Sequence, residues 1–119
     1  MRVDRGTIVL VDFPFSGGAG SKIRPALVVQ ADRNNRRLSS TIIAMITSHV
    51  THAANDPAQF LIDPTSPEGK SSGLIVPSVV RCDHLFTIEQ VRMIRSLGRL
   101  SASHLPLLDS SLKAALDIA

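Results

Sequence analysis

The amino-acid sequence predicts a mainly β protein with a C-terminal helix, built as a small, strongly curved β-barrel. Two observations support this prediction: β-branched runs recur between proline and glycine breakers, and a leucine stripe with helical spacing occupies the tail. Sandwiches use strands of the same kind, so periodicity alone does not choose between barrel and sandwich. The length of 119 residues suits one core, and we expect a single domain over residues 1–119.

Three strands are expected in the first half of the chain, over residues 7–13, 26–30 and 40–47. The first is a β-branched run bounded by Gly6 and Pro14. The second follows Pro25, which belongs at the start of a strand or on an edge because it cannot donate a ladder hydrogen bond. A turn over residues 33–37 leads to the third strand, which is apolar on both faces until it emerges at Thr47.

Two further strands are expected over residues 59–63 and 74–80, separated by an exposed linker rich in Pro, Gly and Ser. Pro77 interrupts the second of them, which indicates an edge position or a bulge. Residues 91–100 predict a short helical turn followed by a strand. The tail predicts an amphipathic helix with Ser103 as its cap and Pro106 in its first turn. Its apolar stripe consists of Leu105, Leu108, Leu112 and Leu116.

Composition and charge restrict the classes of function. The formal net charge is +3, and arginine dominates the cations, which fits an anionic partner but is shared by many proteins. Trp and Tyr are absent, so any binding of RNA would depend on charge and shape rather than on base stacking. The single Cys82 excludes an intrachain disulfide. We expect a cytoplasmic protein, because there is no apolar signal core and no run near the roughly 18 residues that span a bilayer.

Arg24 is the first candidate for chemistry. It lies between a loop of glycines and serines, which includes Ser21, and the strand after Pro25. Glycine lets a backbone approach a ligand closely, and a guanidinium fork suits phosphate. Lys22 adds a second cation, and Thr47 adds a hydroxyl if its strand ends on the same rim. These groups predict a phosphate site, with an ordinary surface arginine as the alternative interpretation.

The other reactive side chains are interpreted as structural. His49 and His52 have no third ligand at a recognisable spacing, so no metal site is expected. Cys82 lies two residues before His84, on the same face if the segment is extended, and is interpreted as a buried thiol rather than a nucleophile. No phosphate-binding loop or dinucleotide fingerprint occurs, so no cofactor is expected.

Several fragments together resemble the MazF/PemK family of toxins from bacterial toxin–antitoxin pairs. They are residues 5–13, 24–29, 46–48, 87–88 and 97–101, followed by the amphipathic helix. The resemblance implies an SH3-like barrel of the CcdB/PemK type and a homodimer. It also implies metal-independent cleavage of single-stranded RNA at short sequences, leaving 2′,3′-cyclic phosphate and 5′-hydroxyl ends. A cognate antitoxin that occupies the RNA groove is the expected protein partner.

The same resemblance implies roles for individual residues. Arg24 would be catalytic with Thr47 as its partner, the guanidinium stabilising charge on the phosphate and the hydroxyl donating to it. The general base stays open, because an arginine is a poor base at neutral pH, and either His49 or His84 is a candidate to assist proton transfer. The expected substrate contacts are Ser21, Lys22, Ser48, His49 and His84.

Two alternatives belong to other functional classes. A CcdB-like toxin would poison DNA gyrase through residues of the C-terminal helix, without cleaving RNA. A noncatalytic barrel would bind nucleic acid and do no chemistry. The Arg24 and Thr47 motifs favour the nuclease over both.

Overall fold

The computed structural model describes residues 2–14, 22–51 and 55–119. Six antiparallel strands form one sheet in the order β4-β5-β3-β2-β1-β6. The strands are β1 (Thr7–Phe13), β2 (Lys22–Val28), β3 (Ser40–Thr47), β4 (Gln59–Ile62), β5 (Ser78–Glu89) and β6 (Met93–Arg99). The helices are α1 (Asp32–Arg37) and α2 (Leu105–Leu116), and the 3-10 turns are η2 (Lys70–Ser72) and η3 (Gln90–Arg92). A mainly β protein with a C-terminal helix is therefore confirmed.

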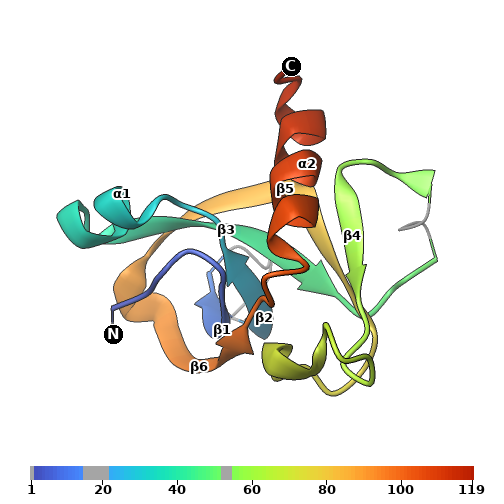
Figure 1. Cartoon of the computed structure of the whole chain (residues 1–119). Helices are drawn as coiled ribbons and strands as arrows, with labels where there is room; N and C mark the ends of the chain where they lie inside the picture. The colour runs from blue at the N-terminus through green and yellow to red at the C-terminus, as the bar shows by residue number, and fades with distance from the viewer. Residues whose placement is uncertain (1, 15–21, 52–54) are drawn as a thin grey trace.

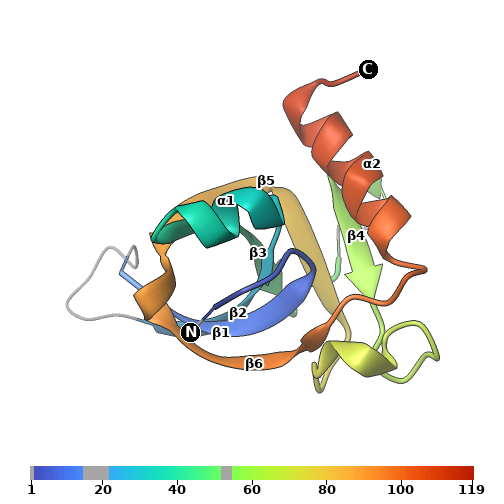
Figure 2. The same cartoon turned by 60° about the vertical axis from the view of Figure 1, so that its left-hand side comes forward.

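The sheet curls round on itself, and α2 lies against β4 and β5 (Figures 1 and 2). The curl produces two apolar clusters on opposite faces of the strands. Ile8 and Leu27 point to one face, where they join the cluster that contains Leu108 of α2. Their neighbours Val9 and Ala26 point to the other face and pack inside the curl. Each central strand is thus buried on both sides, which explains its nearly continuous apolar sequence.

The long strand β5 bends at a bulge, and this bend lets it pair with both β3 and β4. Ala44 of β3 pairs with Leu85 and the next residue pairs with Arg81, so residues 82–84 have no partner on β3. Cys82 is buried and His84 is exposed. The interpretation of Cys82 as a buried thiol is confirmed, and the bulge interrupts the regular alternation of side chains between Cys82 and His84.

Residues 33–37, predicted as a turn, lie instead within the short helix α1. A buried amide holds this helix to the sheet: Asn35 Nδ2 donates to the carbonyl oxygen of Gln30 at 3.0 Å, and its Oδ1 accepts from Thr41 Oγ1 at 2.6 Å. Polar residues are expected on the surface, so no local sequence pattern indicates that Asn35 is an interior residue.

Two strand boundaries differ from the prediction because of prolines. Strand β2 already begins at Lys22, and Pro25 lies inside it; the missing N–H is tolerated because pairing with β3 starts only at Ala26. Strand β5 begins at Ser78, directly after Pro77, so the predicted strand over residues 74–80 is wrong in its first half. Residues 74–77 run outside the sheet.

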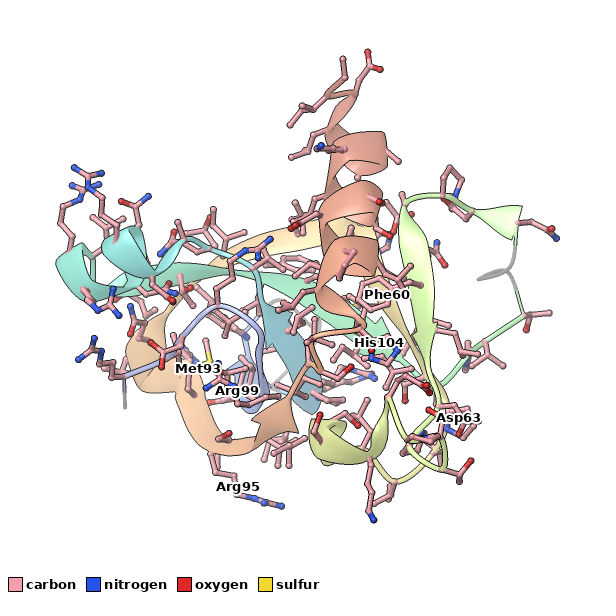
Figure 3. The ribbon with its side chains drawn as sticks, in the orientation of Figure 1. Phe60, Asp63, Met93, Arg95, Arg99 and His104 are labelled. Carbon is pink, nitrogen blue, oxygen red and sulfur yellow. The ribbon has the colours of Figure 1, made fainter. Side chains whose placement is uncertain are left out.

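The segment predicted as an exposed linker is partly packed. Within it Gly69 and Ser72 are buried, and Ser72 Oγ donates to the carbonyl oxygen of Gly69 at 2.7 Å. The expected Ser103 cap is also wrong: His104 occupies the N-cap position of α2, and the amide of Leu105 donates to the carbonyl oxygen of Ser101. Figure 3 shows His104 beside Phe60 of β4 at the base of the helix, with their ring centroids 6.1 Å apart.

The remaining predictions of elements are confirmed. Strands β1 and β3 and the turn-then-strand of η3 and β6 occur where expected, and β4 ends one residue earlier than predicted. The leucine stripe forms α2, with Leu108 fully buried. None of the helices in the described parts of the chain has the length and apolar character needed to cross a bilayer.

Candidate active site

Strand register brings Arg24 and Thr47 together. Strands β2 and β3 pair through Val28–Ile43, Leu27–Ala44 and Ala26–Met45. Continuing this antiparallel register by two residues sets Arg24 opposite Thr47, beyond the last paired residues. Side chains opposite each other in such a pair lie on the same face. The end of the β2–β3 pair therefore places a cation and a hydroxyl next to one another.

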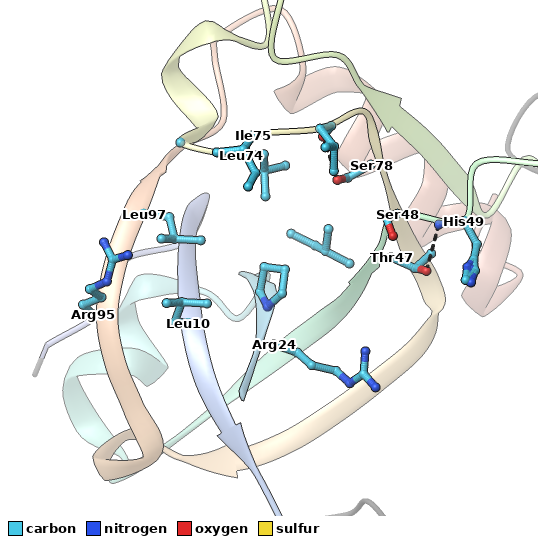
Figure 4. Close-up of a pocket in the computed structure, with 14 residues that line it drawn as sticks. Leu10, Arg24, Thr47, Ser48, His49, Leu74, Ile75, Ser78, Arg95 and Leu97 are labelled. Atoms are coloured by element: carbon cyan, nitrogen blue, oxygen red, sulfur yellow. Dashed lines mark hydrogen bonds between the residues drawn. The ribbon is translucent and has the colours of Figure 1, made fainter. Parts of the chain in front are cut away.

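A pocket of about 470 Å³ opens at this end of the sheet (Figure 4). Arg24 and Pro25 contribute from β2, Thr47 closes β3, and Leu10 and Leu97 come from β1 and β6. The segment from Gly73 to Val76 lines another side, and Ser78 Oγ donates to the carbonyl oxygen of Val76 at 3.0 Å. Arg24 is exposed and Thr47 is half-buried. Both are thus open to a ligand that enters from solvent.

The hydroxyl of Thr47 is oriented by the chain that follows it. The backbone N–H of His49 donates to Thr47 Oγ1 at 3.1 Å, the dashed line in Figure 4. This bond uses an acceptor site of the oxygen and leaves the O–H available as a donor. The geometry suits a group that donates a hydrogen bond to an anionic oxygen.

The pocket is cationic and apolar. Arg24 contributes from β2 and Arg95 from β6 on the opposite side, and neither forms an ion pair with any described residue. The described residues that line the pocket include no Asp or Glu. Sequence reasoning missed Arg95, because the arginines between apolar residues in 91–100 gave no indication of which one faces the site.

The structure unites some of the predicted site residues and separates others. Ser48 and His49 line the pocket beside Thr47. Lys22 is exposed at the first residue of β2, and His84 is exposed in the β5 bulge; neither is among the residues that line this pocket. Ser21, with the rest of the glycine-rich loop, and His52 lie outside the described residues. Substrate contacts by Ser21, Lys22 and His84 stay predictions.

No metal centre is found within residues 2–14, 22–51 and 55–119, where no three His, Cys, Asp or Glu side chains are grouped closely enough to hold an ion. The thiol of Cys82 is free and buried. Its burial, with a smaller contribution from the neighbouring Asp83 carboxylate, raises the pKa of Cys82 from its ordinary value of 9.0 to about 12. The thiol is therefore protonated at neutral pH.

This raised pKa predicts a loss of stability in alkali. Above pH 9 the unfolded chain releases the Cys82 proton while the folded chain retains it. Ionisation therefore lowers the free energy of the unfolded state but not that of the folded state. The contribution of the protonated Cys82 thiol to the free energy of unfolding is fully present below pH 9 and is lost progressively as the pH rises toward 12. At pH 10 the expected loss is about 1 kcal/mol.

Urea unfolding of wild type and Cys82→Ala at pH 7.5 and pH 10 measures this effect. The stability difference between the two proteins is expected to shrink by that amount at the higher pH, because alanine does not ionise. Other groups that titrate in this range are common to both proteins. A difference that stays constant with pH would show that the folded thiol ionises normally.

Comparison with known proteins identifies the family. Residues 4–116 match the model of the "PemK-like, MazF-like toxin of type II toxin-antitoxin system" family. The chain is 34% identical over 118 residues to endoribonuclease MazF9 of Mycobacterium tuberculosis, an alignment covering 96% of each protein. The solved structure of the Mycobacterium tuberculosis toxin MazF-mt6 has a TM-score of 0.76 at 26% identity, covering 95% of this chain and 98% of that one.

A second solved structure agrees on the fold. An endoribonuclease from a mycobacterial species, solved in complex with its cognate antitoxin, matches with a TM-score of 0.77 at 17% identity, covering 98% of this chain and 97% of that one. The predicted CcdB/PemK-type fold is thereby confirmed. The family model and the Mycobacterium tuberculosis relative both match the chain over nearly all its length. The chain therefore belongs to the PemK-like, MazF-like family of toxins of type II toxin–antitoxin systems.

Proposed function

We propose that this protein is the toxin of a type II toxin–antitoxin pair and acts as an endoribonuclease on single-stranded messenger RNA. The observation that carries the proposal is the placement of Arg24 and Thr47 on one open, cationic pocket where the pairing of β2 with β3 ends. Membership of the family and the similarity to endoribonuclease MazF9 support the same activity. Messenger RNA as the substrate would place this activity in the cytoplasm.

The proposed reaction is an internal transesterification. The 2′-oxygen of a ribose attacks the adjacent phosphorus, the bond from phosphorus to the 5′-oxygen breaks, and a 2′,3′-cyclic phosphate forms. The 2′-hydroxyl loses its proton and the departing 5′-oxygen gains one. Negative charge builds on the phosphate oxygens in between, where the Arg24 guanidinium and the Thr47 hydroxyl stabilise it more than in the ground state. No residue in this scheme needs a metal ion.

Proton transfer falls to a neighbour of this pair. His49 lines the same pocket, and its backbone already contacts Thr47. An imidazole exchanges protons near neutral pH far more readily than a guanidinium does. We therefore favour His49 over His84 as the group that assists proton transfer, because His84 does not line the pocket.

Two protein partners belong to the proposal. A cognate antitoxin would silence the toxin by covering this pocket, and the similar mycobacterial endoribonuclease was solved with its own antitoxin. Arg24 and Arg95, which form no ion pair with a described residue, suit an antitoxin segment that carries acidic side chains. A second copy of this chain is expected to form a homodimer, and light scattering measures its mass. The rim residue Ile75, which is 93% exposed, offers apolar surface for either partner.

The gyrase-poison alternative is not favoured. Such a toxin would act through the C-terminal helix, yet α2 uses Leu105, Leu108 and Leu112 of its apolar stripe to cover the core. The similar proteins are named endoribonucleases. We expect no inhibition of DNA supercoiling by gyrase at protein concentrations that cleave RNA completely.

One assay tests the proposed function. Purified protein is incubated with a long RNA of mixed sequence in excess EDTA, and the new 5′ ends are mapped. We expect cuts at a restricted set of sequences, with 5′ ends that accept phosphate from a polynucleotide kinase without prior dephosphorylation. Intact RNA, or cleavage that stops when the chelator is added, would contradict the proposal.

Substitution of Thr47 tests the donor role of its hydroxyl. Thr47→Val preserves the size and branching of the side chain but removes the O–H, and we expect cleavage to fall about 100-fold, the usual loss for one transition-state donor. Thr47→Ser keeps the hydroxyl and is expected to remain within about fivefold of wild type. Single-turnover rates on one oligonucleotide measure both variants. Equal losses in the two would indicate that Thr47 acts through packing alone.

A further inference from the structure

A second pocket adjoins the candidate active site on the side of β4. Its described lining consists of Thr47, His49, Asp56, Gln59 and Arg81, around a space of about 450 Å³. Thr47 and His49 also line the first pocket, so the two spaces meet at the end of β3. A strand of RNA with its phosphate at Arg24 and Thr47 therefore has a polar space beside it.

Register places the polar side chains of this pocket on the same face as Thr47. Met45 pairs with Arg81 of β5, and Arg81 pairs with Gln59 of β4. Met45 lies two residues before Thr47 on β3, so both point to one face of the sheet. Arg81 of β5 and Gln59 of β4 therefore lie on the same face of the sheet as Thr47, in a row of paired residues that includes Met45.

Hydrogen bonds fix these side chains before any ligand arrives. Gln59 Nε2 donates to Asp56 Oδ2 at 3.1 Å and to Asp83 Oδ2 at 3.3 Å. Arg81 holds Asp83 through two bonds, Nε to Oδ1 at 3.2 Å and Nη2 to Oδ2 at 2.9 Å. Asp56 Oδ1 accepts the backbone N–H of Ala58 at 2.9 Å. The pocket wall is therefore preorganised rather than a set of independent surface groups.

The network leaves a defined pattern of free groups. Both hydrogens of the Gln59 amide point at carboxylates, so its Oε1 is left as an acceptor, and Arg81 Nη1 is left as a donor among the bonds of the described residues. Arg81 holds the pKa of Asp83 below its ordinary value, so this carboxyl is ionised at neutral pH. The lining therefore offers acceptors at Gln59 Oε1 and at the Asp56 carboxylate, and a donor at Arg81 Nη1.

We propose that this second pocket binds a nucleobase next to the scissile phosphate and selects bases that carry an exocyclic amino group. The inference rests on the proposed function. Adenine, cytosine and guanine each carry an amino group that can donate to Asp56 or to Gln59 Oε1, whereas uracil presents two carbonyl oxygens and a single N–H. A carbonyl oxygen against the Asp56 carboxylate or Gln59 Oε1 leaves acceptors facing acceptors. Uracil is therefore disfavoured at one position beside the cut.

Sequencing the products of a randomised RNA pool tests the selection. For wild type we expect uracil to be depleted at least tenfold at one fixed position adjacent to the cleaved bond, the discrimination of a well-formed base contact. Asp56→Asn keeps Oδ1 for the Ala58 N–H and replaces Oδ2, the acceptor for Gln59 Nε2, with an amide donor. This variant is expected to reduce the depletion of uracil to less than threefold while it still cleaves RNA.

A matched control is Asp117→Asn, which makes the same change of charge at the end of α2. Asp117 has a φ of 55°, a left-handed conformation that asparagine adopts readily. The control is expected to keep the wild-type base preference. A second readout uses the Arg24→Ala protein, whose binding to short oligonucleotides that differ at the one selected position is measured by fluorescence anisotropy.

The outcomes separate this inference from the proposed function. Cleavage by wild type without depletion of uracil, or the same depletion in Asp56→Asn, would overturn the base pocket and leave the nuclease intact. Binding that discriminates against uracil without any cleavage would overturn the nuclease and support the pocket. Protein that neither cuts nor binds RNA would overturn both.

Discussion

Arg24→Ala is expected to lower RNA cleavage about a thousandfold and to leave the fold unchanged. The loss is large because the guanidinium supplies positive charge and directed donors at the phosphate, where charge increases during the reaction. The fold is spared because Arg24 is exposed and forms no ion pair with a described residue. A surface substitution of this kind changes stability by about 0.5 kcal/mol or less. Single-turnover cleavage and the thermal midpoint measure the two effects separately.

Two variants sharpen the test of Arg24. Arg24→Lys keeps the charge but loses the planar fork, so a rate between those of wild type and Arg24→Ala is expected. Arg99→Ala is the matched control, because Arg99 is another exposed arginine, at the end of β6, and it does not line the pocket. Wild-type cleavage by Arg24→Ala, or an equal loss in Arg99→Ala, would remove the basis for assigning the chemistry to this residue.

The elements that the sequence predicted well are those in which buried apolar residues recur at a regular spacing. Strands β1 and β3 and helix α2 are bounded by breakers and carry many apolar residues, so local pattern and tertiary packing agree. The helix α1 was missed because it depends on Asn35, whose buried amide is satisfied by Gln30 and Thr41. These hydrogen bonds come from residues outside the helix, so no local sequence pattern indicates that the Asn35 side chain is buried.

The candidate site was predictable in part. Arg24 and Thr47 are each marked by a strand end next to a breaker or a polar run, and the β2–β3 register then brings them together. The residues around them come from distant segments. Arg95 and the wall from Gly73 to Val76 enter the pocket only through the pairing of β6 with β1 and the course of the segment before β5. His84 lies in the bulge at 82–84 and is not among the residues that line this pocket, and a bulge has no signature in this sequence.

Gly73→Ala is expected to lower the free energy of unfolding by about 3 kcal/mol and to reduce RNA cleavage as well. Gly73 has a φ of +74°, where a side chain is strained, and a Cβ would lie 1.9 Å from the Leu97 carbonyl oxygen. Strain and overpacking each cost about 1–3 kcal/mol. The chain must therefore move away from β6 at this point. Gly73 and Leu97 both line the pocket, so the same movement displaces its wall.

Gly6→Ala distinguishes the effect of backbone strain from the effect of steric overlap between an added Cβ and its neighbours. Gly6 also has a positive φ, +92°, but a Cβ there would meet only Leu105 Cδ2 at an ordinary 3.8 Å. This variant should lose about 1–2 kcal/mol from strain alone and keep wild-type cleavage at temperatures below its unfolding transition. Urea unfolding and single-turnover cleavage at 20 °C measure both proteins. Equal destabilisation of the two, with cleavage retained by Gly73→Ala, would show that the segment before β5 yields without disturbing the pocket, and that the close packing of Gly73 on Leu97 does not shape the site.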